Sequence, residues 1–180
     1  MNVWQPPGQT ISQEDLLVVE SLVKKRCRGV LSVASRCPCG HVEVIRYYPL
    51  SRGRSGEVVA PFPTLYWLVC PAIIRQVSCL EAAGGVDRME TRLRREPELL
   101  DAYRRNHEAY RRERWSLLTE EDRRLIEERG WGEVYHQRGI GGILDWRHVK
   151  CLHLQYAHHR ATENVVGACV EELAGVRGCA

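Results

Sequence analysis

The stretch GVLSVASRCPCGHVEVIRYY, residues 29–48, decides the expected fold. Two runs rich in β-branched and aromatic residues flank a short turn, which is the pattern of a β-hairpin. Pro38 and Gly40 supply the reversal of the chain, and Cys37 and Cys39 stand on either side of the proline. The turn either carries sulfur by chance or forms one part of a metal site.

A helix is expected before the hairpin and a third strand after it. In residues 12–25 the apolar positions recur at helical spacing, and Ser12 with Asp15 resembles a capping box. Residues 50–63 are predicted to form a loop because of their Gly, Ser and Pro content. The run TLYWLV, residues 64–69, has the length and apolar character of a buried strand.

From Pro71 onward the sequence changes to helical patterns. Pro71 and Pro97 are placed as first-turn residues, Thr119 as a helix cap and Gly130 as a helix stop. A late helix is expected over residues 146–160, after a glycine-rich loop. The order of elements predicts an α+β fold, in which a small antiparallel three-stranded sheet packs against a predominantly helical C-terminal part.

Length and composition are those of one domain. The 180 residues, with 44% hydrophobic content, are expected to form a single domain over 1–180, with a helix and sheet over 12–70 and a helical region over 71–180. No stretch has the order of a signal peptide, and no apolar run approaches the roughly 18 residues that span a bilayer. A cytoplasmic protein is therefore expected, whose eight cysteines are reduced thiols or metal ligands.

Four of the cysteines lie at predicted element boundaries. Cys37 and Cys39 lie in the hairpin turn, and Cys70 ends the third strand. Cys151 lies in the late helical stretch, where a helix N-terminus favours the thiolate form. We predict one metal centre held by these four sulfurs. The other cysteines are predicted to act as small hydrophobic residues. They are Cys27, Cys79, Cys169 and Cys179.

The cysteine spacing bears on the identity of the metal. Structural zinc is usually held by pairs separated by two to four residues, whereas one residue separates Cys37 from Cys39. Positions i and i+2 of a strand lie about 6.6 Å apart, but two thiolates on one zinc lie about 3.8 Å apart. A larger cluster, and the Cys-Pro pair at Cys70, fit iron–sulfur ligation. An iron–sulfur cluster is favoured, and zinc is the alternative.

His153 and His158 accompany Cys151 in the late helix, and they are the candidate catalytic residues. A histidine here would replace a cysteine as ligand, donate a hydrogen bond to a ligand sulfur, or act as an acid or base near neutral pH. The sequence contains no Walker loop, dinucleotide-binding fingerprint, nucleophile elbow or HExxH motif. It therefore does not decide whether the protein is an enzyme.

A local excess of positive charge surrounds the hairpin. The net charge is only +3, but residues 24–54 hold eight Lys or Arg and one acid, Glu43. Such an excess is able to attract the phosphates of a nucleic acid or of another phosphate-bearing ligand, which is one interpretation. A solvated basic face is the favoured interpretation, because no interleaved aromatic platform accompanies the charges. The basic residues are Lys24, Lys25, Arg26, Arg28, Arg36, Arg46, Arg52 and Arg54.

Five motifs follow one another along the chain: RGVLSVASRCPCG, PFPTLYWLVCP, SCLEAAGGVDRM, GIGG and VKCLHLQYAH. Together they resemble the bacterial family called domain of unknown function 501, over roughly residues 27–167. Members of that family typically share the paired cysteines, the Cys-Pro and the Lys-Cys-Leu-His. In this chain the matching positions are Cys37, Cys39, Cys70, Cys151 and His153. The resemblance implies the same candidate site but no reaction.

Two functions fit these patterns. One is a metal-binding protein that acts on a phosphate-bearing or RNA-like substrate drawn to the basic segment. The other is a non-catalytic binding module, in which a structural zinc joins sheet to helix and the basic segment docks a protein or nucleic-acid partner. Four cysteine ligands in a closed shell would favour the module, whereas three ligands with an open position facing His153 would favour catalysis.

Overall fold

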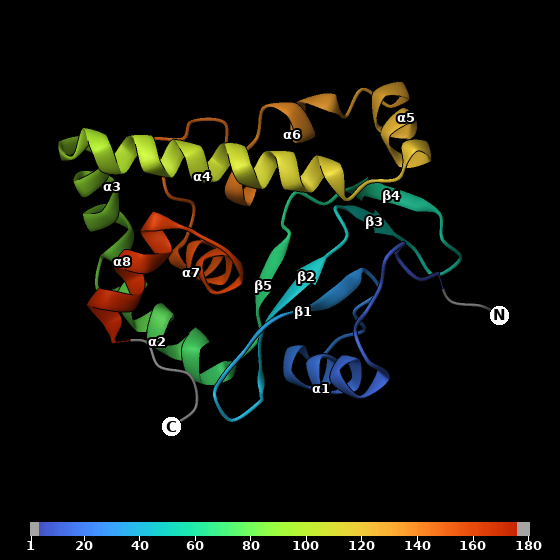
Figure 1. Cartoon of the computed structure of the whole chain (residues 1–180), viewed down its shortest axis with the longest axis horizontal. Helices are drawn as coiled ribbons and strands as arrows, with labels where there is room; N and C mark the ends of the chain where they lie inside the picture. Colours follow the sequence, from blue (N-terminus) through green and yellow to red (C-terminus); the bar gives the residue numbers. More distant parts are fainter. Residues whose placement is uncertain (1–3, 176–180) are drawn as a thin grey trace.

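The computed structural model describes residues 4–175 of the chain and has the α+β fold that the sequence predicts (Figure 1). Its three-stranded antiparallel sheet has the order β1-β2-β5. The strands are β1 (Val30–Arg36), β2 (Val42–Tyr47) and β5 (Tyr66–Leu68). The C-terminal part is largely helical, also as predicted.

The predicted hairpin is the β1–β2 pair. The backbone N–H of Cys37 donates to the carbonyl oxygen of His41, and the N–H of Gly40 donates back to the carbonyl oxygen of Cys37. Gly40 has a φ of 85°, a left-handed conformation that glycine adopts without strain. The turn chemistry read from CPCG therefore closes the hairpin.

Residues 50–63, predicted to form a loop, contain a second sheet instead. It pairs β3 (Leu50–Arg52) with β4 (Val58–Pro61) in an antiparallel hairpin. The turn closes through the N–H of Gly53, which donates to the carbonyl oxygen of Glu57. The loop prediction was wrong because the glycines, Gly53 and Gly56, occupy only the turn, while the short flanking runs pair across it.

Several helices begin where local signals place them. Ser12 accepts a hydrogen bond from the N–H of Asp15, Thr119 caps the helix that follows it, and Pro71 and Pro97 occupy first turns. The helices are α1 (Gln13–Val23), α2 (Pro71–Ala82), α3 (Gly85–Arg95), α4 (Pro97–Ser116), α5 (Glu120–Glu128), α6 (Gly132–His136), α7 (Leu152–Ala161) and α8 (Val165–Ala174), with a 3-10 turn, η1, at Ile140–Gly142.

The sheet separates two apolar layers, because successive side chains of a strand point to opposite faces. Val44 and Tyr66 belong to the core formed with the C-terminal helices, whereas Ile45 and Trp67 belong to the cluster under α1. Figure 1 shows α7 on one side of the sheet and α1 on the other. Residues on the α1 face are therefore separated from α7 by the sheet itself.

Arg114, near the C-terminal end of α4, is fully buried. Its guanidinium donates to the backbone carbonyl oxygens of Pro63 at 3.3 Å, Tyr135 at 3.2 Å and Gly139 at 3.4 Å. One side chain thereby connects α4 to the segment before β5, to α6 and to the chain after α6. Buried carbonyl groups of this kind cost free energy when they lose their donors.

Arg114→Met should lower the free energy of unfolding by about 2–5 kcal/mol, because several buried carbonyl groups lose their donor at once. Urea denaturation followed by circular dichroism measures the change. The matched control is Arg112→Met on the same helix, where the side chain is 71% exposed and a loss of about 0.5 kcal/mol or less is expected. Equal losses in the two variants would contradict this role of Arg114.

Candidate functional site

The structure does not gather the four predicted cysteine ligands into one group. Cys37 and Cys70 are buried, Cys151 is half-buried and Cys39 is exposed. Among residues 4–175, one group of three or more His, Cys, Asp or Glu residues has its ligand atoms within 4.8 Å of one another. Cys151 is the only cysteine in that group.

Cys70 and Cys151 lie near opposite ends of α2. Cys70 precedes the first turn of the helix, whereas Cys151 lies beside Glu81 in the last turn. From position 70 to position 81, at 1.5 Å per residue, the helix rises about 16 Å, but two sulfurs on one zinc are about 3.8 Å apart. This geometry does not support a single centre that holds both cysteines.

The remaining cysteines were predicted to be small hydrophobic residues. Cys27 and Cys169 are buried in apolar clusters, which confirms the prediction for them. Cys79 is exposed on α2, and Cys179 lies outside the described residues.

The group within 4.8 Å consists of Glu81, Cys151 and His153, all half-buried. Glu81 comes from the last turn of α2, Cys151 immediately precedes α7, and His153 lies in the first turn of α7. Glu81 Oε1 is 3.1 Å from His153 Nδ1. The structure thus brings together two of the sequence-predicted residues and a carboxylate that sequence reasoning missed.

The two ring nitrogens of His153 have different partners. Nε2 lies 3.2 Å from the backbone carbonyl oxygen of Ile74 and 3.1 Å from Ser78 Oγ. A carbonyl oxygen only accepts, so Nε2 carries a hydrogen and Nδ1 faces Glu81. Hydrogen bonding to Cys151, and attraction to Glu81, raise the pKa of His153 to about 9. Three basic atoms this close attract a cation between them, either a proton or a metal ion.

Glu81 also determines where α7 begins. Its Oε1 accepts a hydrogen bond from the N–H of Leu152, the first residue of the helix. Val149, upstream of this point, belongs to no helix, and its N–H donates to Glu90 Oε1 at 3.0 Å. The helix expected from residue 146 therefore starts at residue 152. No local pattern marks Glu81, because its partner lies 71 positions away in the chain.

His158 is not part of this group. Its side chain is buried in the core, where its ring stacks on Tyr66 with centroids 5.5 Å apart. The amide nitrogen of Asn164 lies 3.1 Å from its Nδ1. Burial lowers the pKa of His158 to about 4, so the ring is neutral at physiological pH. The structure gives it a core position rather than the predicted position beside the metal ligands.

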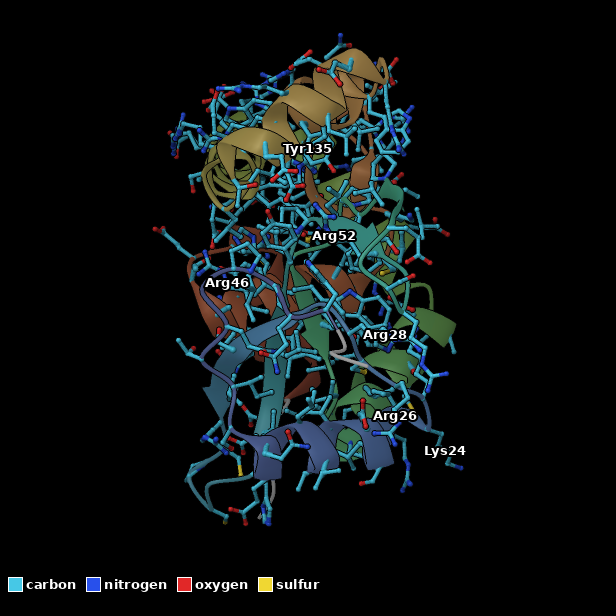
Figure 2. The ribbon with its side chains drawn as sticks, turned by 90° about the vertical axis from the view of Figure 1, so that its right-hand side faces the viewer. Lys24, Arg26, Arg28, Arg46, Arg52 and Tyr135 are labelled. Carbon is cyan, nitrogen blue, oxygen red and sulfur yellow. The ribbon has the colours of Figure 1, made fainter. Side chains whose placement is uncertain are left out.

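The eight basic residues of the segment 24–54 do not form one face. Four of them are in ion pairs: Arg26 with Glu20, Arg36 with Asp15, Arg46 with Glu113 and Arg52 with Asp122. In Figure 2, Arg46 lies apart from Lys24, Arg26 and Arg28. The other four of these eight residues form no ion pair within the described chain: Lys24, Lys25, Arg28 and Arg54.

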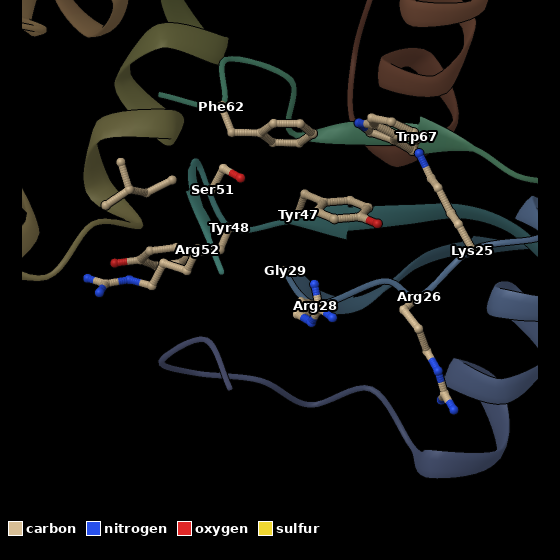
Figure 3. Close-up of a pocket in the computed structure, with 11 residues that line it drawn as sticks. Lys25, Arg26, Arg28, Gly29, Tyr47, Tyr48, Ser51, Arg52, Phe62 and Trp67 are labelled. Atoms are coloured by element: carbon tan, nitrogen blue, oxygen red, sulfur yellow. The ribbon is translucent and has the colours of Figure 1, made fainter. Parts of the chain in front are cut away.

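Part of the basic segment lines a pocket of about 230 Å³ on the α1 face of the sheet (Figure 3). Its wall is an aromatic cluster, in which the ring centroid of Tyr47 is 5.4 Å from that of Phe62 and 5.3 Å from that of Trp67. Aromatic residues therefore do accompany the positive charges, contrary to the expectation from sequence. Tyr47 lies within the basic segment, but Phe62 and Trp67 come from the segment before β5 and from β5, so the aromatic cluster forms only when the chain folds.

The chain belongs to the family described as protein of unknown function DUF501, whose sequence model matches residues 33–172. This confirms the resemblance seen in the five motifs. No curated protein and no solved structure matches the chain. In the part of the chain that the structure describes, no helix combines the length and apolar character needed to cross a membrane.

His158 should make the protein sensitive to acid. Its folded-state pKa of about 4 lies below the ordinary value of 6.5, so the unfolded chain takes up a proton first as the pH falls. The stability contribution is constant above about pH 6.5 and decreases by about 1.4 kcal/mol per pH unit below it. His158→Gln should therefore reduce the loss of stability between about pH 7 and pH 5 by about 2 kcal/mol.

Urea unfolding at the two pH values measures this difference. His136→Gln is the control for the general effect of replacing a histidine by glutamine, because the side chain of His136 is 48% exposed. An identical pH dependence in wild type and His158→Gln would show that the buried ring is not kept neutral.

Proposed function

We propose that this protein binds one zinc ion, or a metal of similar preference, through Glu81, Cys151 and His153. The observation that carries the proposal is the convergence of one thiol, one imidazole and one carboxylate within 4.8 Å. The Nε2 hydrogen of His153 faces the carbonyl oxygen of Ile74, which is how metal-binding histidines are commonly oriented. The ligand nitrogen, Nδ1, is thereby directed to the space between Glu81 and Cys151.

The donor set favours zinc over an iron–sulfur cluster. Iron–sulfur clusters are held mainly by several cysteine thiolates, and this group contains one cysteine, Cys151. Sulfur, nitrogen and carboxylate oxygen together suit zinc, which binds all three. The proposal therefore retains a metal at Cys151 and gives up the cluster that the CPCG spacing favoured.

Three protein ligands support a catalytic rather than a closed structural site. Catalytic zinc sites use three protein ligands and keep one position open, whereas structural sites use four. The side chains of His153 and Glu81 are 27% and 25% exposed, so solvent or a substrate reaches the group. A bound zinc would act there as a Lewis acid, while Glu81 and His153 orient it. We place this activity in the cytoplasm, where Cys151 stays reduced.

A second function, the non-catalytic module with a four-cysteine zinc, has less support. It requires Cys37, Cys39, Cys70 and Cys151 around one ion, and the structure separates Cys70 from Cys151 by the length of α2. The two proposals make opposite predictions for Cys39, which the four-sulfur centre needs and the three-ligand site does not.

Purified protein that is loaded with zinc and then desalted should retain about one zinc per chain. Cys151→Ser should weaken zinc binding by about 100-fold or more, because the serine hydroxyl is a poor replacement for a thiolate ligand. Elemental analysis gives the metal content, and competition with a chromophoric chelator gives the affinity.

Cys39→Ser is the matched control, since Cys39 is exposed and its replacement leaves the core intact. Full zinc retention in Cys39→Ser beside loss in Cys151→Ser supports the three-ligand site. Equal loss in both variants would support the four-cysteine centre instead, and a wild-type protein that retains no zinc would refute both.

A further inference from the structure

We propose that the pocket on the α1 face of the sheet binds a nucleotide unit, with its base against the aromatic wall and its phosphate near Lys25 and Arg28. This inference is independent of the metal proposal, because the pocket and α7 lie on opposite sides of the sheet. It rests on an aromatic surface that lines the same cavity as two basic residues, Lys25 and Arg28, for which the described chain provides no close ion pair.

The aromatic wall is suited to stacking. Phe62 and Trp67 are stacked, with ring centroids 5.8 Å apart and planes at 24°, and both side chains are half-buried rather than fully covered. Tyr47 completes the cluster from β2. Bases of any sequence stack on such rings, since every base has a π-face.

The basic residues around the pocket differ in whether a carboxylate already holds them in an ion pair. Arg26 and Arg52 are held by the carboxylates of Glu20 and Asp122. Within the described residues, Lys25 and Arg28 form no ion pair. Figure 3 shows Lys25 reaching toward the Trp67 ring, with Nζ 4.6 Å from its centroid, and Arg26 pointing away from the aromatic rings. Lys25, which lies over the Trp67 ring, and Arg28, which attracts the carboxylate of Glu57 without a close ion pair, are thus the two cations most accessible to a phosphate group beside the stacking surface.

The dimensions and chemistry favour one nucleotide unit over other ligands. The cavity of about 230 Å³ is smaller than the roughly 300–1,000 Å³ of sites for drug-sized ligands, so it fits one base with part of its sugar and phosphate. A simple anion would use the two cations and leave the rings without a partner. A base that carries phosphate uses both features.

The test is a titration of the full chain with adenosine 5′-monophosphate, with a single-stranded oligoadenylate of about ten nucleotides, and with inorganic phosphate, followed by tryptophan fluorescence and calorimetry. Arg28→Gln and Phe62→Leu should each weaken nucleotide binding by about tenfold, through loss of phosphate attraction and of stacking respectively. Arg26→Gln is the matched control, with the same change of charge two positions away, and should change the affinity by about twofold at most.

Binding of the monophosphate with this pattern of variants supports the proposal and identifies a free nucleotide as the ligand. Binding of the oligonucleotide alone with the same pattern supports it and identifies a single strand as the source of the nucleotide unit. The proposal is overturned if no nucleotide binds to the folded wild-type protein, if inorganic phosphate binds as tightly as the monophosphate, or if Arg26→Gln weakens binding as much as Arg28→Gln.

Discussion

The carboxylate of Glu81 fixes the position of α7. Its Oε1 accepts a hydrogen bond from the N–H of Leu152, a group that would otherwise be unsatisfied at the helix N-terminus, and lies 3.1 Å from His153 Nδ1. α7 then packs against α2, α8 and β5, at the centre of the helical part. The same carboxylate therefore caps the start of α7 and lies beside both Cys151 and His153.

The sheet separates the two candidate sites, although adjacent residues of the same strands face one site and the other. On β5, Tyr66 faces the core that contains α7, and the next residue, Trp67, faces the basic pocket. On β2, Val44 and Ile45 divide in the same way. The alternation of side chains along a strand thus places the group of Glu81, Cys151 and His153 behind one face and an aromatic wall on the other. Ligands of different chemistry would not compete for the same surface.

Local signals predicted most of the fold. The turn in residues 37–40, the cap at Ser12 and the first-turn Pro71 each act within a few residues, and each was visible in the sequence. The sites depend on distant contacts instead. Glu81 has no local mark as a partner of His153, and the aromatic wall comes from three segments. The positions of the cysteines at element boundaries singled out Cys151, and the fold places it with the predicted neighbour His153 and with Glu81 rather than in a group with the other three cysteines.

The central claim is that one sulfur, one imidazole nitrogen and one carboxylate oxygen hold a metal at the start of α7. X-ray absorption spectroscopy at the zinc edge, on zinc-loaded protein, tests it most directly. The spectrum should contain one sulfur at about 2.3 Å and the remaining nitrogen and oxygen donors at about 2.0–2.2 Å. A first shell of four sulfurs, or one without any sulfur, would contradict the claim.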